Sequence, residues 1–452
     1  MAQKIAIIGA GLMGMVLARK LADQGHRVTV YEQQAQTGGL STWHDYGDFV
    51  WDRFYHVILP SDSALIELVR DLDLEQQLHW QRTRTGFYVD HKLYSISNNI
   101  EFLRFPLLSF WSKLRLGWTM LYGSRINDWK KLETRTSEEW LIRVSGRETF
   151  EKMWKPLLLA KLGVHYRRAS AVFIWSYIKR MFSARDKSAD AEHLGHVRGG
   201  YQTIFSALDS AVRKTGGSVR TGTTIDRVHA PGNRLQIESQ AGLDDFDKVI
   251  CTGPVPVLQR IVDPNLLAVT PASGPEDNAD TRTVEYLGVV CVVLVTREPL
   301  VPYYVVNIAD ADIPFTGMIG MSNVADTADT AGLHLTYLPK YILSSDEALQ
   351  LDDEHYQETF LQGVEKMLPD FDRKNLVSVH VNRATTVQPL QVLNYSELIP
   401  TLTTQHPDLF VLNTSQFSHS TLNNNEVVSA VNHFVELHST ALASPAAAAP
   451  AT

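Results

Sequence analysis

The chain has 452 residues, of which 44% are hydrophobic, 20% charged and 9% aromatic. These values are ordinary for a globular protein and exclude a disordered, collagen-like or coiled-coil chain. The formal net charge is −8, from 42 basic and 50 acidic residues, so no overall basic field exists to attract nucleic acid. The length predicts roughly two or three domain-sized units.

The apolar stretches are too short for targeting or for crossing a membrane. Residues 5–8 are too few for the apolar core of a signal peptide, and the longest apolar run, 287–295, falls far short of the roughly 20 residues that a membrane-spanning helix needs. Cys251 and Cys291 lie in apolar runs, which predicts buried thiols and a reducing, cytoplasmic environment. The small-residue tail 443–452 is predicted to be disordered.

The N-terminal residues form a strand, turn, helix and strand in succession. An apolar strand over 4–9 leads into Gly9-Ala10-Gly11-Leu12-Met13-Gly14, a helix follows as far as Gly25, and a strand over 28–31 ends at Glu32. Gly9 permits the tight turn, Gly11 lets the backbone approach a pyrophosphate, and Gly14 lets helix and strand pack closely. Glu32 can bind both ribose hydroxyls and repels a 2′-phosphate. The sequence therefore predicts a dinucleotide site that disfavours NADP.

A second glycine pair follows closely, in Thr37-Gly38-Gly39-Leu40-Ser41-Thr42. It lets the backbone run beside a ligand that extends past the pyrophosphate. From Gly9 to Gly39 the sequence resembles the N-terminal signature of the superfamily of FAD-dependent amine oxidases, protoporphyrinogen oxidases and phytoene desaturases. The resemblance implies a tightly held FAD. Leu40 departs from the pattern, since many members carry an arginine there that helps to anchor the cofactor.

The resemblance also implies the fold. It is an α/β fold with a Rossmann-like FAD-binding domain of the glutathione-reductase/amine-oxidase type, and a discontinuous α+β substrate domain in which helices cover a sheet. We expect the FAD-binding domain to comprise 1–75, 190–278 and 380–442, and the substrate domain to comprise 76–189 and 279–379. We expect about 75–190 to be helical and aromatic, and about 280–345 to be rich in strands.

Turn signals in the middle of the chain delimit a helix and several strands. Gly199-Gly200-Tyr201 precedes a helix that ends at Gly216-Gly217. Four strands are expected after it, over 218–220, 224–228, 235–237 and 246–251. In the superfamily, the equivalent of Val228 touches the adenine through its backbone. The strand that ends at the equivalents of Thr252-Gly253 passes the cofactor again.

The C-terminal part is expected to close the cofactor site. A strand over 408–412 precedes Asn413-Thr414, and the last helix follows Asn423. The superfamily commonly has Gly-Asp here, with the Asp on the ribityl chain and a helix N-terminus facing the N1–C2=O edge of the flavin, where it stabilises negative charge. Asn413 can hydrogen-bond a ribityl hydroxyl without that charge. A capping loop that does not touch the cofactor is the alternative.

These signals together give one set of predicted cofactor-binding residues. They are Gly9, Gly11, Leu12, Met13, Gly14, Glu32, Gln33, Gly38, Gly39, Leu40, Ser41, His56, Val228, Thr252, Gly253, Asn413, Thr414, Asn424 and Asn425.

Three residues are candidates for catalysis. His56 lies in a stretch that enters the isoalloxazine region in the resembling enzymes, and a histidine satisfied by backbone is the alternative. Lys161 lies in an apolar helix that could place a cation in the pocket, or it snorkels on an exposed face. Arg383 precedes Gln388-Pro389 and could bind the O4/N5 side of the flavin or a substrate anion, or serve neither purpose.

No motif favours metal or hydrolase chemistry. His193 and His196 have a spacing that metal sites use, but no third ligand lies nearby and Gly195 breaks any helix, so no metal is predicted. The chain has no Gly-x-Ser-x-Gly elbow.

The segment 103–131 combines large apolar residues with six basic residues and a single acid, Asp128. An apolar face with basic flanks is typical of an interfacial helix. The resembling protoporphyrinogen oxidases and desaturases use a comparable region to reach lipophilic substrates. We therefore expect peripheral membrane contact here, with a substrate-domain helix that has a solvated basic face as the alternative.

The expected function is that of an FAD-dependent oxidoreductase acting on a small, largely apolar molecule. Hydride leaves a C–H or C–N bond of the substrate for flavin N5, and O₂ or another acceptor reoxidises the flavin. Two alternatives stay open. One is a non-redox flavoenzyme resembling UDP-galactopyranose mutase, and the other is an FAD-bound protein without turnover.

Overall fold

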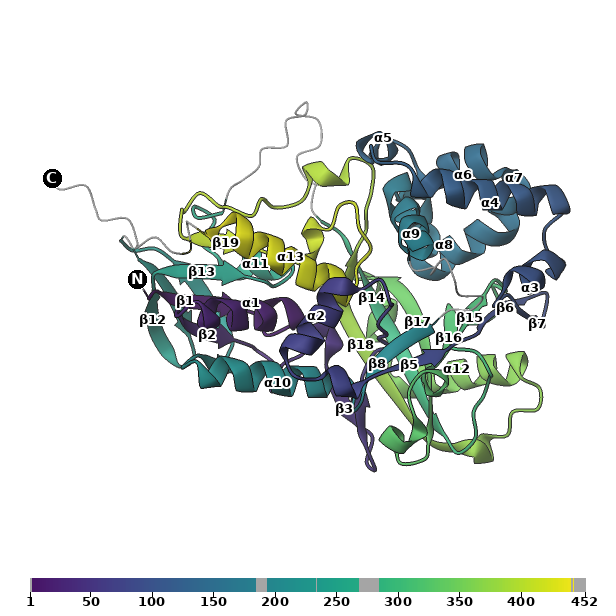
Figure 1. Ribbon diagram of the computed structural model, residues 1–452, viewed down its shortest axis with the longest axis horizontal. Helices are drawn as coiled ribbons and strands as arrows, with labels where there is room; N and C mark the ends of the chain where they lie inside the picture. Colours follow the sequence, from purple (N-terminus) through teal and green to yellow (C-terminus); the bar gives the residue numbers. More distant parts are fainter. Residues whose placement is uncertain (1, 184–192, 233, 268–283, 440–441, 443–452) are drawn as a thin grey trace.

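The computed structural model describes residues 2–183, 193–232, 234–267, 284–439 and 442. The predicted disordered tail lies outside these residues. Two sheets organise the molecule, one at each end of the long axis in Figure 1. Among the described residues, no helix combines the length and apolarity that a membrane span requires.

The first sheet is parallel and has the strand order β19-β13-β1-β2-β9. Its strands are β1 (Lys4–Ile8), β2 (Arg27–Tyr31), β9 (Ser218–Arg220), β13 (Lys248–Cys251) and β19 (Leu409–Val411). They come from three distant parts of the chain. Because the carboxyl ends of parallel strands meet at one edge, this order brings the ends of β1, β13 and β19 together.

Two layers cover this sheet, and β1 shows how the sequence directs them. Ile5 and Ile7 pack against a helical layer, whereas Ala6 and Ile8 pack against the opposite layer, as the two-residue period of a strand requires. The helical layer consists of α1 (Leu12–Asp23), α2 (Ser63–Asp71), α10 (Tyr201–Lys214) and α13 (Asn424–Leu437). The opposite layer consists of the antiparallel strands β10 (Ile225–His229), β11 (Leu235–Ser239) and β12 (Gly242–Phe246), with α11 (Val255–Ile261).

The second sheet has seven strands in the order β18-β14-β17-β16-β15-β6-β7. They are β6 (Thr85–Val89), β7 (Lys92–Ser95), β14 (Tyr286–Thr296), β15 (Val305–Ile308), β16 (Gly317–Gly320), β17 (His334–Leu343) and β18 (Leu376–Pro389). Every residue of β14 is buried, because the strand lies between β17 and β18 and is covered on both faces. The helix α12 (Asp353–Met367) covers one face.

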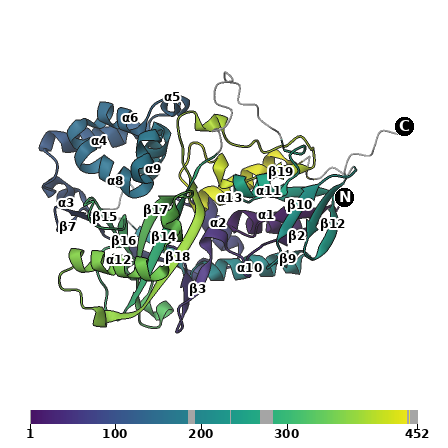
Figure 2. The same cartoon turned by 180° about the vertical axis from the view of Figure 1, so that it is seen from behind.

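A lobe of helices lies on the other side of the seven-stranded sheet from α12 (Figures 1 and 2). It has its own core, centred on Trp140, Trp154 and Trp175. Its helices are α3 (Asn99–Arg104), α4 (Phe110–Ser124), α5 (Lys130–Glu133), α6 (Ser137–Ser145), α7 (Arg147–Thr149), α8 (Lys155–Leu162) and α9 (Ala171–Ser183).

Two small sheets and several short helices complete the described chain. The hairpin of β3 (Trp43–Asp45) and β4 (Val50–Asp52) is antiparallel, as is the ribbon of β5 (Leu78–Arg82) and β8 (His193–Val197). Short 3₁₀ helices span Gly39–Ser41, Glu75–Gln77, Gly163–Arg168, Met321–Asn323, Thr327–Thr330, Glu347–Gln350, Arg373–Asn375, Tyr395–Glu397 and Thr414–Gln416, and a π-helix spans Phe150–Trp154.

The expected α/β fold is confirmed, with a Rossmann-like parallel sheet and a second sheet beneath helices. The expectation that about 75–190 is helical is wrong at its start, where β5, β6 and β7 lie. Thr85–Val89 has the β-branched and aromatic residues of a strand, and Asp90 and His91, both with positive φ, make a tight two-residue turn into β7. Both cysteines are free and buried, as predicted. The domain boundaries stay a prediction.

Candidate cofactor and active site

The turn between β1 and α1 is a close contact of backbone with backbone. A Cβ at Gly14 would lie 1.9 Å from the carbonyl oxygen of Gly9, so only glycine fits there. Gly9 itself has a φ of +108°. Gly11 is the N-cap of α1 and offers no side chain to cap it, with Leu12 and Met13 buried in the first turn of the helix. The uncapped helix N-terminus is a favourable position for a phosphate group.

Glu32 is held by the same turn. Its Oε2 accepts a hydrogen bond of 2.9 Å from the N–H of Ala10, and its Oε1 accepts one of 2.9 Å from the N–H of Gln34, while Gln33 is exposed. The N–H of Thr223 donates to the carbonyl of Glu32 at 2.8 Å. The segment around Thr223 was not predicted to lie here, although its position directly before β10 was an available signal.

The second glycine pair lies against the first turn. The N–H of Gly38 donates to the carbonyl of Ala10 at 2.9 Å, and a Cβ at Gly39 would lie 3.1 Å from the Cα of Gly11. Both glycines have positive φ, +127° at Gly38 and +57° at Gly39. The two turns thus form a backbone-lined cradle that any side chain at Gly39 would narrow. A cradle of this kind at a helix N-terminus fits a pyrophosphate.

Leu40 and Ser41 lead from this cradle to the C-terminal helix. The Ser41 hydroxyl and the Asn424 amide lie 3.1 Å apart, so the start of α13 contacts the 3₁₀ turn of the second glycine pair. The Asn425 Oδ1 instead accepts from the N–H groups of Ala64 and Leu65 and caps α2. Asn424 and Asn425 were both predicted for the cofactor, and the structure brings Asn424 to the glycine cradle.

Thr252 and Asn413 join the ends of the central strands. The Thr252 hydroxyl donates to the carbonyl of Ile8 at 2.9 Å, and Gly253 accepts a 3.0 Å bond from the Asn413 amide. The Asn413 Oδ1 accepts from the N–H of Ser415, which makes Asn413 the buried cap of the 3₁₀ helix that begins at Thr414. Both ends of the Asn413 side chain are therefore bound inside the protein.

Val228 is buried in β10, on the side of the parallel sheet that the antiparallel strands β10, β11 and β12 cover. Its carbonyl accepts from the N–H of Asp263, and its backbone bridges to Val262. The predicted contact with adenine stays a prediction.

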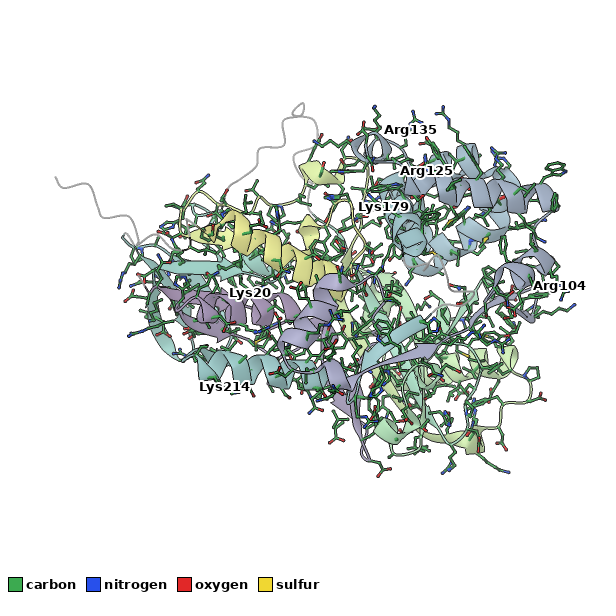
Figure 3. The ribbon with its side chains drawn as sticks, in the orientation of Figure 1. Lys20, Arg104, Arg125, Arg135, Lys179 and Lys214 are labelled. Atoms are coloured by element: carbon green, nitrogen blue, oxygen red, sulfur yellow. The ribbon has the colours of Figure 1, made fainter. Side chains whose placement is uncertain are left out.

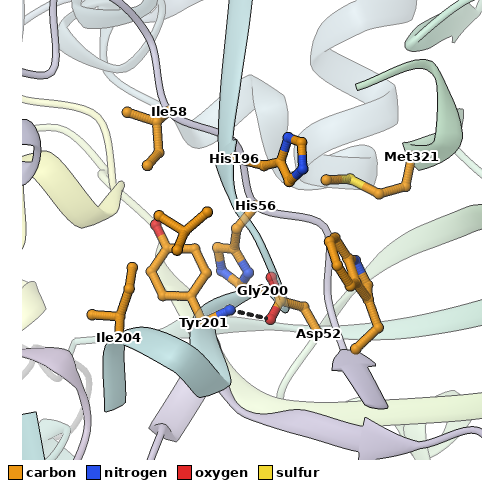
Figure 4. Close-up of a pocket in the computed structure, with 10 residues that line it drawn as sticks. Asp52, His56, Ile58, His196, Gly200, Tyr201, Ile204 and Met321 are labelled. Carbon is orange, nitrogen blue, oxygen red and sulfur yellow. Dashed lines mark hydrogen bonds between the residues drawn. The ribbon is translucent and has the colours of Figure 1, made fainter. Parts of the chain in front are cut away.

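His56 points into a small cavity between the loop after β4, the strand β8 and the start of α10 (Figure 4). The cavity measures about 10 Å³, the space of one water molecule. Asp52, His196 and Tyr201 also line it, and the Asp52 carboxyl accepts the N–H of Tyr201 at 2.8 Å. The His56 Nδ1 lies 3.0 Å from the carbonyl oxygen of Phe54.

Burial shifts the two titratable groups of the cavity in opposite directions. It raises the pKa of Asp52 to about 8 and lowers the pKa of His56 to about 4. At neutral pH the carboxyl is therefore mostly protonated and the imidazole neutral. Both shifts remove charge from the cavity, as a low-dielectric interior favours.

Lys161 takes part in a second group of side chains, on the face of the seven-stranded sheet below the lobe. Its Nζ lies 4.9 Å from the ring centroid of Tyr341, and the Tyr341 hydroxyl lies 2.9 Å from that of Tyr55. Tyr177 of α9 is close enough to interact with the same ammonium. No ion pair among the described residues includes Lys161. We call Tyr55, Lys161, Tyr177 and Tyr341 the lysine–tyrosine cluster.

Burial shifts the pKa of two tyrosines in the cluster. Burial, reinforced by the neighbouring Tyr341, raises the pKa of Tyr55 well above its usual value. Burial also raises the pKa of Tyr177. The cluster therefore offers one cation, three aromatic rings and hydroxyls that can donate hydrogen bonds.

Arg383 lies on the opposite face of the sheet from the lysine–tyrosine cluster. In the register of β14, Tyr341 stands opposite Val289 and Arg383 opposite Val290, so the two side chains leave the sheet on different sides. The Arg383 guanidinium pairs with Asp353 of α12 and donates to the carbonyl of Leu351. The structure does not bring Arg383 together with Lys161 or His56.

His193 and His196 are three residues apart in the strand β8, so they lie on opposite faces of it. His196 is buried, with its Nε2 3.7 Å from Asp329, whereas His193 is exposed. The two imidazoles therefore do not point to a common ligand.

A parallel sheet with this glycine turn, beside a second sheet beneath helices, is suited to binding a dinucleotide cofactor next to a separate substrate domain. A family model described as "Flavin containing amine oxidoreductase" matches residues 12–411. The chain belongs to this family, and its cofactor is FAD.

Individual relatives match shorter parts of the sequence. The 15-cis-phytoene desaturase of Synechococcus elongatus is 33% identical over 94 residues, which are 19% of this chain and 20% of that protein. A protein of Klebsiella pneumoniae described as "Probable UDP-galactopyranose mutase" is 25% identical over 214 residues, 46% of this chain and 53% of that protein. The chain thus spans a fifth to about half of the length of these curated relatives.

The fold is shared over nearly the whole chain with solved structures. A putrescine oxidase bound to putrescine superposes with a TM-score of 0.73, covering 97% of this chain and 99% of that one at 15% identity. At this identity the likeness concerns the fold alone.

Proposed function

We propose that the chain is an FAD-dependent oxidoreductase that removes a hydride from a small, largely apolar substrate, either from an ordinary C–H bond or from the C–H bond next to an amine nitrogen. The observation that carries the proposal is the lysine–tyrosine cluster. It combines aromatic walls with a cation that no described carboxylate neutralises, and it lies between the lobe and the seven-stranded sheet. Pockets with apolar walls and a few placed polar groups are typical of small-molecule sites.

The residues around the two glycine turns would hold the cofactor. Backbone at Gly11 and Gly39 admits the pyrophosphate, Glu32 binds the ribose, and the start of α13 at Asn424 closes the site. Bound FAD supplies an electrophilic N5 that accepts the hydride.

The side chains of the chain itself position the substrate and keep water out. The rings of Tyr55, Tyr177 and Tyr341 would bind and orient the apolar part of the substrate. Lys161 would hold a bound water at Nζ beside the Tyr55–Tyr341 hydroxyl pair, and that water can take up the proton that the substrate loses with the hydride.

The names of the relatives support a C–H or C–N substrate. A phytoene desaturase acts on an apolar molecule and a putrescine oxidase binds an amine. An apolar substrate partitions into lipid, so a peripheral location at a membrane fits this function.

Anaerobic bleaching of the flavin absorbance by a panel of amines and apolar C–H substrates tests the proposal. We expect at least one panel member to bleach the flavin, and Lys161→Met to slow that bleaching by roughly 10²-fold or more, the usual effect of losing a proton-transfer group. Lys155→Met is the matched control on the same helix, because Lys155 is paired with Glu151. Equal rates of flavin bleaching for the two variants would show that Lys161 does not act in the site.

A non-redox reaction of the UDP-galactopyranose mutase type is the second candidate, favoured by the match to the Klebsiella protein. It predicts no bleaching by any panel member and isomerisation of a nucleotide sugar by the chemically reduced protein. A protein without turnover shows neither. The same panel with a nucleotide sugar added, run with oxidised and with reduced protein, therefore separates the three functions.

A further inference from the structure

The solvent side of the helical lobe carries an apolar surface formed by α3 and α4. Trp111 is 77% exposed and Trp118 59% exposed, values unusual for the largest apolar side chain. We call this surface the α3–α4 patch. Its members are Ile100, Leu103, Phe110, Trp111, Leu114, Trp118 and Tyr122.

The helix α4 carries apolar residues on its solvent-facing side, unlike a helix that only packs on a core. Its buried residues, Leu116, Thr119 and Gly123, recur at three- and four-residue spacing and face the lobe. Phe110, Leu114, Trp118 and Tyr122 recur every four residues and form a second, solvent-facing stripe. An exposed apolar stripe of this kind marks a surface that binds a second apolar partner.

The segment that carries the patch has an excess of basic residues, although the whole chain has a net charge of −8. Between residues 99 and 133 there are six basic and three acidic residues. Two of the acids are engaged inside the protein, since Glu101 accepts from Ser95 and Glu133 from Ser396. Figure 3 shows Arg104 and Arg125 on the lobe, both exposed, with Lys20 and Lys214 on the far part of the molecule.

We propose that the α3–α4 patch docks on the surface of an anionic membrane, with its aromatic side chains in the interface and Arg104, Lys113, Arg115, Arg125, Lys130 and Lys131 near the lipid headgroups. Tryptophan and tyrosine are the side chains that membrane interfaces favour, and basic residues beside them complement anionic lipid. A protein partner would meet the same apolar stripe, but the excess of basic residues favours a negatively charged surface. The proposal holds whatever the substrate is, so it does not depend on the proposed reaction.

Co-sedimentation of the holoprotein with vesicles tests the docking. Vesicles of phosphatidylcholine with roughly 30% phosphatidylserine should bind the protein, and pure phosphatidylcholine should bind it less, with binding that weakens as salt is raised. Trp111→Ser/Trp118→Ser should weaken binding by about tenfold or more, because the apolar area entering the interface is lost. Arg104→Glu/Arg125→Glu should weaken binding to the anionic vesicles alone.

Controls change the same kinds of residue elsewhere. Leu243→Ser/Val377→Ser removes exposed apolar side chains outside the lobe, and Lys20→Glu/Lys214→Glu makes the same change of charge on the distant part of the molecule; both should bind as the unaltered protein does. Thermal unfolding checks the fold of each variant, and the single change Trp111→Ser serves if the double variant does not fold. The proposal is overturned if no vesicle binds the protein at low salt, or if the patch variants bind normally. It is also overturned if they change the oligomeric state in lipid-free solution, which would make the patch a protein interface.

Discussion

At the scale of single residues, the loop after β4 sends successive side chains to two different places. Tyr55 joins Tyr341 and Lys161 beneath the lobe, and His56 enters the cavity with Asp52. An extended backbone alternates its side chains, so one short segment serves both groups. His56 and Lys161 were candidates from the sequence, whereas Tyr55, Tyr177 and Tyr341 were not. Contacts between residues so far apart in the chain leave no local signal.

Asp52 should make the stability of the protein depend on pH. Its pKa is about 8 when folded and about 3.9 in an unfolded chain. Between these two values the folded chain keeps a proton that the unfolded chain has lost. The contribution of Asp52 to the free energy of unfolding is therefore full below about pH 3.9 and is lost progressively as the pH rises through about 8. The opposite shift of His56, whose pKa is about 4 when folded, acts only below its ordinary value of 6.5.

Asp52→Asn should therefore flatten the pH dependence above pH 6.5. For the unaltered protein we expect the free energy of unfolding to fall by about 1–2 kcal/mol between roughly pH 6.5 and 8.5. Urea unfolding of both proteins at the two pH values measures it, with Asp48→Asn as the control because Asp48 is exposed on the hairpin β3–β4. An identical pH dependence in the Asp52→Asn variant and the unaltered protein would show that Asp52 is ionised when folded.

At the scale of elements, the packing of α1 on β1 depends on the absence of one methyl group. Gly14→Ala places a Cβ against the carbonyl of Gly9, and helix and strand must move apart. We expect a loss of at least about 1–3 kcal/mol of stability, the usual cost of overpacking. Gly117→Ala in α4 meets no atom within 4 Å, and it should stabilise the protein by about 0.5–1 kcal/mol. Thermal unfolding of the two variants decides, and equal melting temperatures would contradict the packing argument.

The elements that could be predicted from the sequence are those whose signals are local. Gly9, Gly11 and Gly14 mark the turn by their spacing, and the strand and helix beside them follow from the period of the apolar residues. The strands β5–β7 were not predicted, because the aromatic, helical pattern of the residues after them was taken to cover the whole stretch from about 75 to 190. The hydrogen bond from Asn413 to Gly253 could not be predicted, since the two residues lie 160 positions apart in the chain. The cap at Asn413 is local, because its partner is Ser415.

At the scale of the whole molecule, the proposed cofactor site is assembled from three distant parts of the chain. The glycine turns, Thr252-Gly253 and the start of α13 meet at the carboxyl edge of the parallel sheet. A ligand that binds only the folded chain stabilises it by mass action, by about 2.7 kcal/mol when present at a hundred times its dissociation constant.

Removal of FAD should therefore lower the melting temperature of the whole protein. We expect differential scanning calorimetry to show the apoprotein melting several degrees below the holoprotein, since about 1 kcal/mol corresponds to about 2–4 °C in a protein of 150–250 residues and somewhat less in a longer one. Added FAD should restore the higher value, whereas added NAD should not. An apoprotein that melts at the same temperature as the holoprotein would place the cofactor outside the links between these segments.

The strand order of the parallel sheet also has a consequence for how the chain acquires its structure during synthesis. β1 and β2 leave the ribosome first, but β1 pairs on its other side with β13, and β13 pairs with β19. At roughly 5–20 residues per second, the free edge of β1 stays unpaired for about 10–50 s until β13 has been made. The outer edge of β13 then stays unpaired until β19 has been made. The helical layer over Ile5 and Ile7 stays incomplete in that interval, since α10 is made only shortly before β13 and α13 only after it. Nascent chains that end before β19 are therefore expected to expose an unpaired apolar strand edge. Such chains are the form of the protein most in need of a chaperone.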